Sequence, residues 1–567
     1  MKLLVSILLA LGAAALFAEP AVSHGTGGAV AAAEENAARV GIEILRGGGN
    51  ASDAAVAVAF ALAVTWPEAG NIGGGGFWTS RDAQGRITTI DFRETAPRLA
   101  RRDLFFSSAG AGAAPSSTQG PLASGIPGTV AGLALAHRRT GRLPWKAILE
   151  PAVRLARDGF TMTPAISGSI ASERERLAGD AATARIFLPA GAPPVPGAIF
   201  KQPELARTLE AIRDRGEDGF YRGRVARAIE EGQKRSRGLI SRGDLARYEA
   251  RIRTPVRFRF GDCEIVTTAA PSSGHVLAEM ALLAEIVGRE KFRNADAASA
   301  HWLAEIEKRA FHDRNRYLGD PAFGRVEEKL LIDPARLKLI AASIDPERAT
   351  PTGRLSLPEK ERTTTTHFSV ADGQGMAVSV TTTLNDSFGN ARVAPGLGFL
   401  WNNEMDDFTT RPGERNMYGL VQGEVNSVAP GKRMLSSMCP SIAVSGGRNA
   451  LVWGTPGGST IPTTNLQVLI QRVLRGEPLE AAVAAPRFHQ QDLPDEISVE
   501  RDRFDFGWMD ALRKMGHTVT ERRPCPVASG SCGPIGRVHA IGLEKDGVMT
   551  AVADPRGNGA GLVVDAR

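Results

Sequence analysis

The chain has 567 residues, 43% of them hydrophobic and 23% charged, which is enough for one large layered unit or for two lobes. Its 68 Lys and Arg against 62 Asp and Glu give a net charge of only +6 and form no polybasic block. The composition therefore does not indicate a nucleic-acid-binding protein, and we expect no nucleic-acid partner.

The N-terminus is typical of a secretory signal. Lys2 precedes an uncharged apolar run from Leu3 to Ala18, which is shorter than the roughly 20 residues that span a bilayer. We predict that residues 1–18 are a signal peptide cut after about Ala18. Because Leu16 stands where a small residue is usual, a retained anchor is the alternative. No later segment is apolar enough to cross a membrane, so we expect an exported protein, periplasmic or secreted.

Two helices are expected next. Ala31–Leu45 is amphipathic and is followed by the glycines Gly47–Gly49, and Ser52 is expected to cap an apolar helix, Ala54–Val64. A helix that is apolar nearly all round must be buried. The run Gly73–Gly76 lacks the Gly-Lys-Ser/Thr of a phosphate-binding loop and predicts a tight turn with close backbone approach.

Residues 144–340 have mainly helical periodicity, clearest in Glu204–Asp214 and Ala297–His312. Arg251–Phe260 instead alternates polar and apolar residues, which predicts an edge strand with one solvated face rather than a nucleic-acid groove. The histidines have no metal-ligand spacing, so we expect no metal site.

A polar segment, 346–362, resembles an exposed linker, and two β-rich runs follow it. His367–Ala371 and Met376–Leu384 are joined by Asp372–Gly375, a sequence that predicts a β-hairpin. The threonines Thr363–Thr366 lie where the linker meets the first strand, as β-branched residues commonly do. The alternative is a nucleophile: the α-amino group of an N-terminal Thr can serve as its base, if the chain is cut just before it.

Four cysteines would meet an oxidising compartment after export. Cys525 and Cys532 flank a loop rich in Pro, Gly and Ser and are able to close a short disulfide. Alternatively all four, including Cys263 and Cys439, are small buried hydrophobic residues. No Cys-x-x-Cys spacing indicates metal or redox chemistry.

The threonine run belongs to a larger pattern. Thr365–Val370 is followed by Thr383–Asn385 and then by Asn402–Phe408. In these segments the chain resembles the γ-glutamyltransferase (γ-glutamyltranspeptidase) family of N-terminal-nucleophile hydrolases, and the resemblance extends over essentially the whole mature chain. Other segments match in the family's order: Gly48–Ala55, Gly70–Phe77, Asp91–Pro97, Tyr317–Pro321, Lys432–Met438 and Gly454–Ser459.

The resemblance implies an α+β fold, the four-layer αββα sandwich of these hydrolases, built from two chains after self-cleavage. The bond between Thr364 and Thr365 would be cut. Residues 19–364, with the linker 346–364, would form a helix-rich large subunit, and 365–567 a β-rich catalytic small subunit. The two would remain associated, because a strand separated from its sheet exposes unpaired backbone groups.

The same resemblance assigns roles to the reacting groups. Thr365 is the expected nucleophile, with the Thr383 hydroxyl orienting it. The backbone N–H groups of Gly457 and Gly458 would form an oxyanion hole, for which glycine allows close approach. Tyr418 lies in a segment that resembles the lid loop of bacterial members.

A γ-glutamyl group ends in an α-amino acid zwitterion, and the resemblance assigns a residue set to each charge. The expected α-carboxylate site combines a guanidinium fork with two hydroxyl groups, from Arg93, Ser436 and Ser437. The expected α-ammonium site is rich in acceptors, from Asn385, Glu404 and Asp407.

The function implied is a self-processing γ-glutamyltransferase and glutathione hydrolase. It would act on glutathione and other γ-glutamyl compounds, transfer the acyl group to water or to an acceptor amino acid or peptide, and need no cofactor. A cephalosporin (glutaryl) acylase of the same superfamily is the alternative, although a glutaryl group has no ammonium for the acceptor-rich set. A further alternative is a binding protein with the same fold that never matures.

Overall fold

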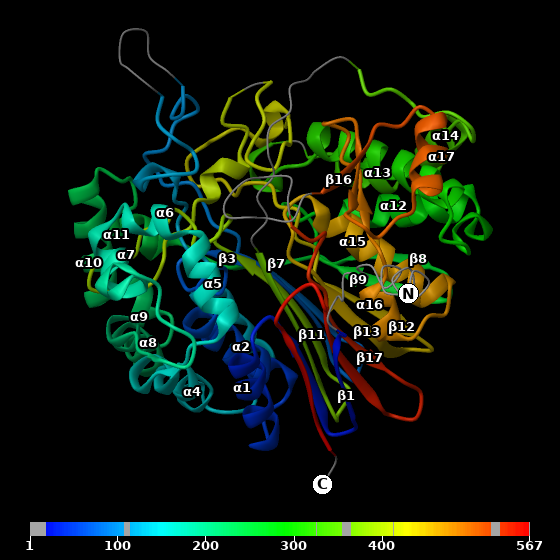
Figure 1. Cartoon of the computed structure of the whole chain (residues 1–567). Coiled ribbons are helices and arrows are strands. Elements are labelled where there is room, and N and C mark those ends of the chain that lie inside the picture. Colours follow the sequence, from blue (N-terminus) through cyan, green and yellow to red (C-terminus); the bar gives the residue numbers. More distant parts are fainter. Residues whose placement is uncertain are drawn as a thin grey trace, which may run out of the picture.

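The computed structural model describes residues 19–106, 114–324, 326–353, 365–411, 413–522 and 533–565. The predicted signal, Thr364 and the pair Cys525 and Cys532 lie outside the described residues. Two seven-stranded sheets stack face to face, and helices cover both outer sides (Figure 1). This arrangement confirms the predicted α+β class and the αββα order of layers.

The first sheet has the strand order β19-β2-β10-β11-β3-β4-β7, and all its neighbours are antiparallel. The predicted hairpin forms its centre. Its strands in that order are Ala560–Val564, Gly28–Ala32, Thr365–Asp372, Ala377–Thr383, Gly75–Arg81, Ile87–Asp91 and Arg251–Arg253.

The second sheet has the order β1-β18-β17-β13-β12-β9-β8 and is also antiparallel throughout. Its strands in that order are Ala21–Gly25, Met549–Ala553, His539–Leu543, Arg448–Gly454, Ser441–Ser445, Cys263–Thr267 and Val256–Phe260. Smaller sheets pair β5 (Phe160–Thr161) with β6 (Ile199–Phe200), and β15 (Ile497–Glu500) with β14 (Phe488–His489) and β16 (Val519–Arg522).

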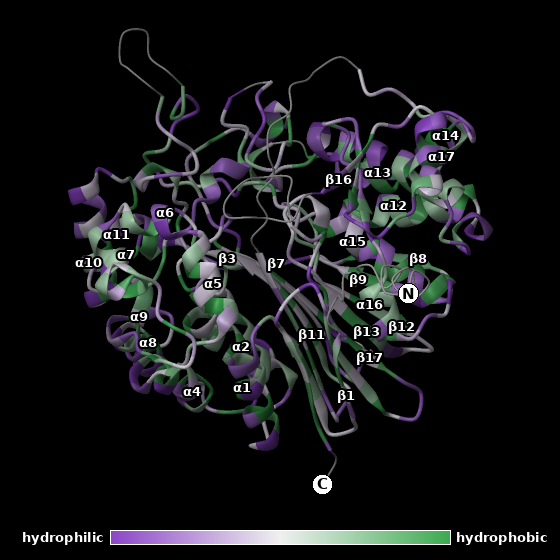
Figure 2. Cartoon of the chain, in the orientation of Figure 1, coloured by the Kyte–Doolittle hydropathy of each residue, from purple (hydrophilic) through white to green (hydrophobic). Residues whose placement is uncertain are grey.

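Helices α1–α11 gather outside the first sheet and α12–α17 outside the second (Figure 1). The first group is α1 (Glu35–Arg46), α2 (Ala51–Thr65), α3 (Thr129–Thr140), α4 (Trp145–Asp158), α5 (Pro164–Ser172), α6 (Arg174–Ala178), α7 (Ala181–Phe187), α8 (Pro203–Arg215), α9 (Asp218–Tyr221), α10 (Gly223–Ser236) and α11 (Arg242–Arg247). The second is α12 (Gly274–Val287), α13 (Ala297–Tyr317), α14 (Pro334–Ala342), α15 (Thr460–Leu469), α16 (Leu479–Ala484) and α17 (Phe506–Lys514). Their polar residues face mainly outward (Figure 2).

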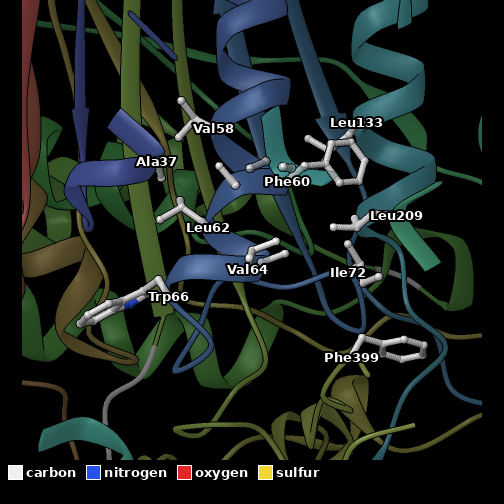
Figure 3. Close-up of a cluster of buried hydrophobic side chains, with 14 of the residues drawn as sticks. Ala37, Val58, Phe60, Leu62, Val64, Trp66, Ile72, Leu133, Leu209 and Phe399 are labelled. Carbon is white, nitrogen blue, oxygen red and sulfur yellow. The ribbon is translucent and has the colours of Figure 1, made fainter. Parts of the chain in front are cut away.

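Helix α2 is the buried helix that the sequence predicted. All its residues are buried, and it packs against β10 and β11 with Phe60 and Leu62 in the surrounding core (Figure 3). Its N-cap is Asn50 in a capping box with Asp53, so the prediction of Ser52 as the cap is wrong. Asn50 is a better cap here because its side chain accepts from the Asp53 N–H while Asp53 accepts from the Asn50 N–H.

The helix predicted from Ala31 begins only at Glu35 in the structure. Ala31 and Ala32 belong to β2, which lies between β10 and β19. The alanines favour a helix locally, but the two neighbouring strands pair their backbone groups. Glu34 then caps α1 by accepting from two backbone N–H groups.

The predicted edge strand Arg251–Phe260 is two edge strands. Arg251–Arg253 (β7) ends the first sheet and Val256–Phe260 (β8) ends the second. Pro255 separates them and cannot donate to a ladder, so the chain changes sheets at that point. In β8 the two arginines are exposed and the three apolar residues are buried, as the alternation predicted.

An apolar layer lies between the two sheets, and the first sheet contributes mainly alanines to it. The layer between them includes Ala29, Ala371, Ala377 and Ala551, and the predicted hairpin contributes one face of both strands. The opposite face of that hairpin carries Phe368 and its neighbours into the core beneath α2. Neighbouring residues of β10 therefore meet two different environments.

Several smaller expectations are also resolved. Residues 346–353 form no helix or strand and are largely exposed, and α8 and α13 contain the predicted helical segments. Cys263 and Cys439 are free and buried. A Cβ atom on Gly73 or Gly74 would come within 2.1 Å of a carbonyl oxygen, which confirms the close backbone approach. Across the described segments, no helix combines the length and apolar character of a membrane span.

Candidate functional site

The two threonines assigned to the chemistry lie opposite each other in the central hairpin. Thr365 begins β10 and pairs in register with Thr383, the last residue of β11. Their Oγ1 atoms are 3.5 Å apart, with Thr365 as donor, and both residues are buried. Thr383 Oγ1 also accepts from the backbone N–H of Asn385, 2.8 Å away. The geometry places the Thr383 hydroxyl where it can orient Thr365.

Strand alternation separates Thr365 from Thr366. Thr365 has the same parity as His367 and Ser369, which contact residues of the second sheet, whereas Thr366 has the parity of Phe368, in the core beneath α2. Thr366 Oγ1 is buried and has no hydrogen-bond partner among the described residues. Of these two hydroxyls, only that of Thr365 reaches Thr383.

Tyr418 covers this end of the hairpin. Its hydroxyl lies 2.6 Å from Asn385 Oδ1 and 2.8 Å from the Asn385 carbonyl oxygen, and it donates toward both. Its ring lies over Gly458, where an added Cβ would meet ring carbons at 2.4 Å. Burial, followed by the nearby Asp407 and Glu404 carboxylates, raises the pKa of the Tyr418 phenol well above its ordinary value, so it remains a donor. The loop thus packs on the predicted site.

Gly457 and Gly458 have backbone conformations that favour glycine. Their φ angles are 140° and 56°, and the carbonyl oxygens of both begin the turn into α15. A Cβ at either position would collide, with Thr460 Oγ1 at Gly457 and with Tyr418 at Gly458. Glycine is therefore required at both positions, because any larger side chain would clash with these neighbours.

Arg93 lies in a buried cluster of carboxylates. Its Nη1 is 2.6 Å from Glu404, in the 3₁₀ turn Glu404–Asp407, and its Nη2 donates to Asp407. Glu94 lies 3.7 Å away from the same guanidinium. Neither Glu404 nor Glu94 accepts a well-aligned hydrogen bond from any described residue. Three carboxylates thus share one arginine, which is an arrangement short of positive charge.

The pKa values in this cluster follow from burial. Burial raises the pKa of Glu94 to about 8 against the opposing effect of Arg93. Burial likewise raises the pKa of Glu404 well above its ordinary value and also raises that of Asp407. Perturbed carboxylates of this kind concentrate at functional sites, because a ligand can supply the missing charge.

Ser436 and Ser437 also lie near Arg93. Arg93 donates to the carbonyl oxygens of Met434 and Leu435, immediately before them. Ser436 Oγ accepts from the Met438 N–H at 3.2 Å, and Ser437 Oγ accepts from Arg314 Nη2 at 3.1 Å. Within the described segments neither hydroxyl hydrogen has a protein acceptor, so two O–H donors are available.

The predicted residues therefore form one connected region. One chain of contacts runs from Thr365 through Thr383 and Asn385 to Tyr418 and Gly458. Asn385 also donates to the carbonyl oxygen of Asn403. The next residue in the sequence, Glu404, pairs with Arg93. The structure brings these residues close together, and the occupation of the Arg93 fork by two carboxylates was not expected.

Two residues of this region were missed. Glu94 directly follows Arg93 within the matched segment Asp91–Pro97, but no role was assigned to it. Arg314 lies on α13, two residues beyond the predicted helical segment Ala297–His312, and it is 1% exposed. An arginine within a helix gives no sign of its burial until the helix is placed against its neighbours. As for metals, the described residues contain no group of three His, Cys, Asp or Glu suited to hold an ion.

Comparison with known proteins agrees with this arrangement. The family model for Gamma-glutamyltranspeptidase matches residues 37–564. The chain belongs to this family. It is therefore an enzyme of the gamma-glutamyltranspeptidase family, and the resemblance seen in the sequence is confirmed.

Individual relatives cover nearly the whole chain. The glutathione hydrolase proenzyme of Escherichia coli (strain K12) is 41% identical over 534 residues, 93% of this chain and 90% of the relative. That of Pseudomonas aeruginosa is 43% identical over 552 residues, 95% of each. Among solved structures, a cephalosporin acylase from Bacillus halodurans superposes with a TM-score of 0.85, covers 96% of this chain and 97% of its own, and is 24% identical, which supports the fold alone.

Proposed function

We propose that this gamma-glutamyltranspeptidase-family enzyme hydrolyses glutathione and transfers γ-glutamyl groups, with Thr365 as its nucleophile. The main observation behind this proposal is the Thr365–Thr383 pair, which lies beside a carboxylate cluster that is short of positive charge. Relatives named glutathione hydrolase proenzyme support the substrate class.

The substrate's charges match those of the protein. An α-ammonium placed among Asn385, Glu404 and Asp407 would supply the cation that the Arg93 cluster lacks. An α-carboxylate placed at Ser436 and Ser437 would accept their two unused O–H donors. In this proposal the γ-carbonyl points toward Thr365, which is linked to Asn385 through Thr383.

In the reaction, the α-amino group of Thr365 takes the proton of Oγ1 as this oxygen attacks the γ-carbonyl carbon. The N–H groups of Gly457 and Gly458 stabilise the oxyanion of the tetrahedral intermediate. The amide C–N bond then breaks, the leaving amine takes the proton, and a γ-glutamyl ester of Thr365 remains. Water or the amine of an acceptor amino acid or peptide attacks this ester, which releases glutamate or a new γ-glutamyl compound.

A free α-amino group on Thr365 requires that the bond from Thr364 to Thr365 be cut. We therefore propose maturation into a large subunit, 19–364, and a small subunit, 365–567, that stay together. Support comes from β10, which lies between β2 of the first part and β11 of the second, so that the sheet joins both. The word proenzyme in the relatives' names agrees with such processing. We also propose export with removal of residues 1–18.

The decisive variant is Thr365→Ala. It removes the attacking hydroxyl, so we expect an uncut chain on a denaturing gel and a loss of more than about 10³-fold in glutathione hydrolysis. Thr366→Ala is the matched control, since its hydroxyl lies on the other face of β10; it should mature and retain activity. A Thr365→Ala protein that splits normally and releases glutamate would refute the assignment, and N-terminal sequencing of the small fragment checks the register.

The glutaryl acylase alternative predicts a different substrate. Purified protein is offered γ-glutamyl and glutaryl 4-nitroanilides in parallel, which differ in the α-ammonium. The buried Glu404 and Asp407 carboxylates favour the first by about 100-fold or more, because a glutaryl chain leaves them unpaired. Preference for the glutaryl anilide would reverse the proposal, and turnover of neither by an uncut chain would favour a non-maturing binding protein.

A further inference from the structure

Arg314 is a buried arginine whose charge is not paired. It is 1% exposed on α13, and no carboxylate oxygen of the described segments lies within ion-pair distance of its guanidinium. Burial lowers its pKa to about 10, with Asp407 opposing that change and Arg93 adding to it. A guanidinium with this pKa stays charged at neutral pH. Because an unpaired buried charge is costly, its position beside the site calls for an explanation.

The Arg314 guanidinium makes one hydrogen bond to its neighbour Asn315. Its other hydrogen bonds lead, directly or through Ser273, to the segment assigned to the substrate carboxylate. Its Nη2 donates to Ser437 Oγ at 3.1 Å, and its Nε donates to Ser273 Oγ at 3.2 Å. Ser273 in turn donates to the carbonyl oxygen of Ser436 at 2.6 Å. One guanidinium therefore holds both serines, one directly and one through Ser273.

This arrangement fixes where the Ser437 hydroxyl can donate. Its oxygen already accepts from Arg314, so its hydrogen must point away from that guanidinium. Donation from a charged group also polarises the hydroxyl and makes it a stronger donor to an anion. Arg314 itself has five N–H donors, of which three have acceptors, with Asn315 Oδ1 as the third.

Arg93 alone cannot supply the positive charge that an α-carboxylate needs. Its two terminal nitrogens face Glu404 and Asp407, so its charge is largely compensated within the protein. Arg314 also acts on Asp407, whose pKa it lowers as Arg93 does, although it forms no ion pair with that carboxylate among the described residues. A zwitterionic ligand needs separated charges. The carboxylates lie on the Arg93 side, and the unpaired positive charge lies at Arg314.

We propose that Arg314 is the positioning residue that makes the site specific for an α-carboxylate. It aims the Ser437 hydroxyl, fixes Ser436 through Ser273, and supplies the positive charge that Arg93 shares with Glu404 and Asp407. This inference rests on the proposed γ-glutamyl function and names a determinant of its substrate class. Acyl groups with the ammonium but without the α-carboxylate gain nothing from Arg314.

The test compares two anilides on the mature enzyme, γ-glutamyl 4-nitroanilide and 4-aminobutanoyl 4-nitroanilide, which lacks only the α-carboxylate. In Arg314→Met we expect kcat/KM for the first to fall about 30-fold, mainly through KM, while that for the second changes less than about threefold. Arg314→Lys, which keeps the charge but not the fork, should show an intermediate loss. Arg316→Lys, on an exposed position of the same helix, is the matched control and should leave the ratio unchanged.

Each outcome decides the inference. Equal losses for both anilides would mean that Arg314 only supports the fold, and would overturn it. If Arg314→Met does not accumulate, the ratio measured in Arg314→Lys and in Ser273→Ala decides in its place: a selective loss supports the inference and an unchanged ratio refutes it. A wild-type enzyme that cleaves no γ-glutamyl anilide would refute the proposed function instead, so the two failures are distinguishable.

Discussion

Two buried arginine clusters in this enzyme have opposite character. One joins Arg487 and Arg556 to Asp554 and Glu500, near the second sheet. Each of its four carboxylate oxygens receives two donors, including the backbone N–H groups of Val538 and of Arg487 itself. Burial acts to raise the pKa of Asp554, but Arg487 and Arg556 hold this pKa below its ordinary value.

The cluster around Arg93 has the reverse balance. One arginine faces three carboxylates, the oxygens of Glu94 and Glu404 have no aligned donor among the described residues, and burial raises the pKa values of all three acids. The comparison teaches that burial and charge alone do not mark a site. A fully hydrogen-bonded network stabilises the fold, whereas an incomplete one leaves room for a ligand's charge.

The largest effects are expected from exchanging one aspartate of each cluster for asparagine. Asp554→Asn leaves two guanidinium groups facing one carboxylate, so we expect a loss of about 3–5 kcal/mol in the free energy of unfolding and little change in KM. Asp407→Asn should cost about 1 kcal/mol of stability, because its environment already disfavours the charge. It should, however, lower kcat/KM for γ-glutamyl substrates about 100-fold.

Denaturant unfolding and steady-state kinetics on both variants provide the measurement. If Asp407→Asn proved the more destabilising of the two, the distinction between a structural and a ligand-binding cluster would be wrong.

A second prediction concerns pH. Burial raises the pKa of Glu94 from 4.5 to about 8, so the folded state holds this proton more tightly than the unfolded chain does. The stability from this group is complete below about pH 4.5 and is lost as the pH rises toward 8. Glu94→Gln removes this titration, so its melting temperature should depend less on pH between 5 and 8 than that of the wild type. Parallel slopes in thermal melts across this range would contradict the prediction.

The smallest effect is expected from Tyr418→Phe. The ring stays over Gly458, but the hydrogen bonds to the Asn385 oxygens are lost. We expect a fall in kcat/KM of about fivefold, corresponding to roughly 1 kcal/mol. Tyr418→Ala also removes the ring and should have a larger effect. Equal kinetics for wild type and both variants would show that this loop does not cover the substrate.

Local sequence patterns predicted much of the architecture. The turn Asp372–Gly375 and the flanking β-branched runs predicted the central hairpin, since its register depends on neighbours in the chain. The apolar run Ala54–Val64 predicted a buried helix, and the observed helix, α2, is buried along its whole length. The resemblance supplied the site residues, and the structure brings them close together.

Other features required the tertiary structure. Ala31 and Ala32 became strand because β10 and β19 flank them, and Arg251–Phe260 divided because β7 pairs with β4 in the first sheet and β8 with β9 in the second. Such outcomes depend on partners distant in sequence, which local propensity does not contain.

The family and the central hairpin followed from the sequence alone. The folded structure was needed to show that Arg93 is paired with carboxylates, that Arg314 has no such pair among the described residues, and that Glu94 is buried among like charges. The physical reason is that a charge's role depends on its burial and on the groups within a few ångströms of it. Those groups come from segments hundreds of residues apart, and folding alone brings them together.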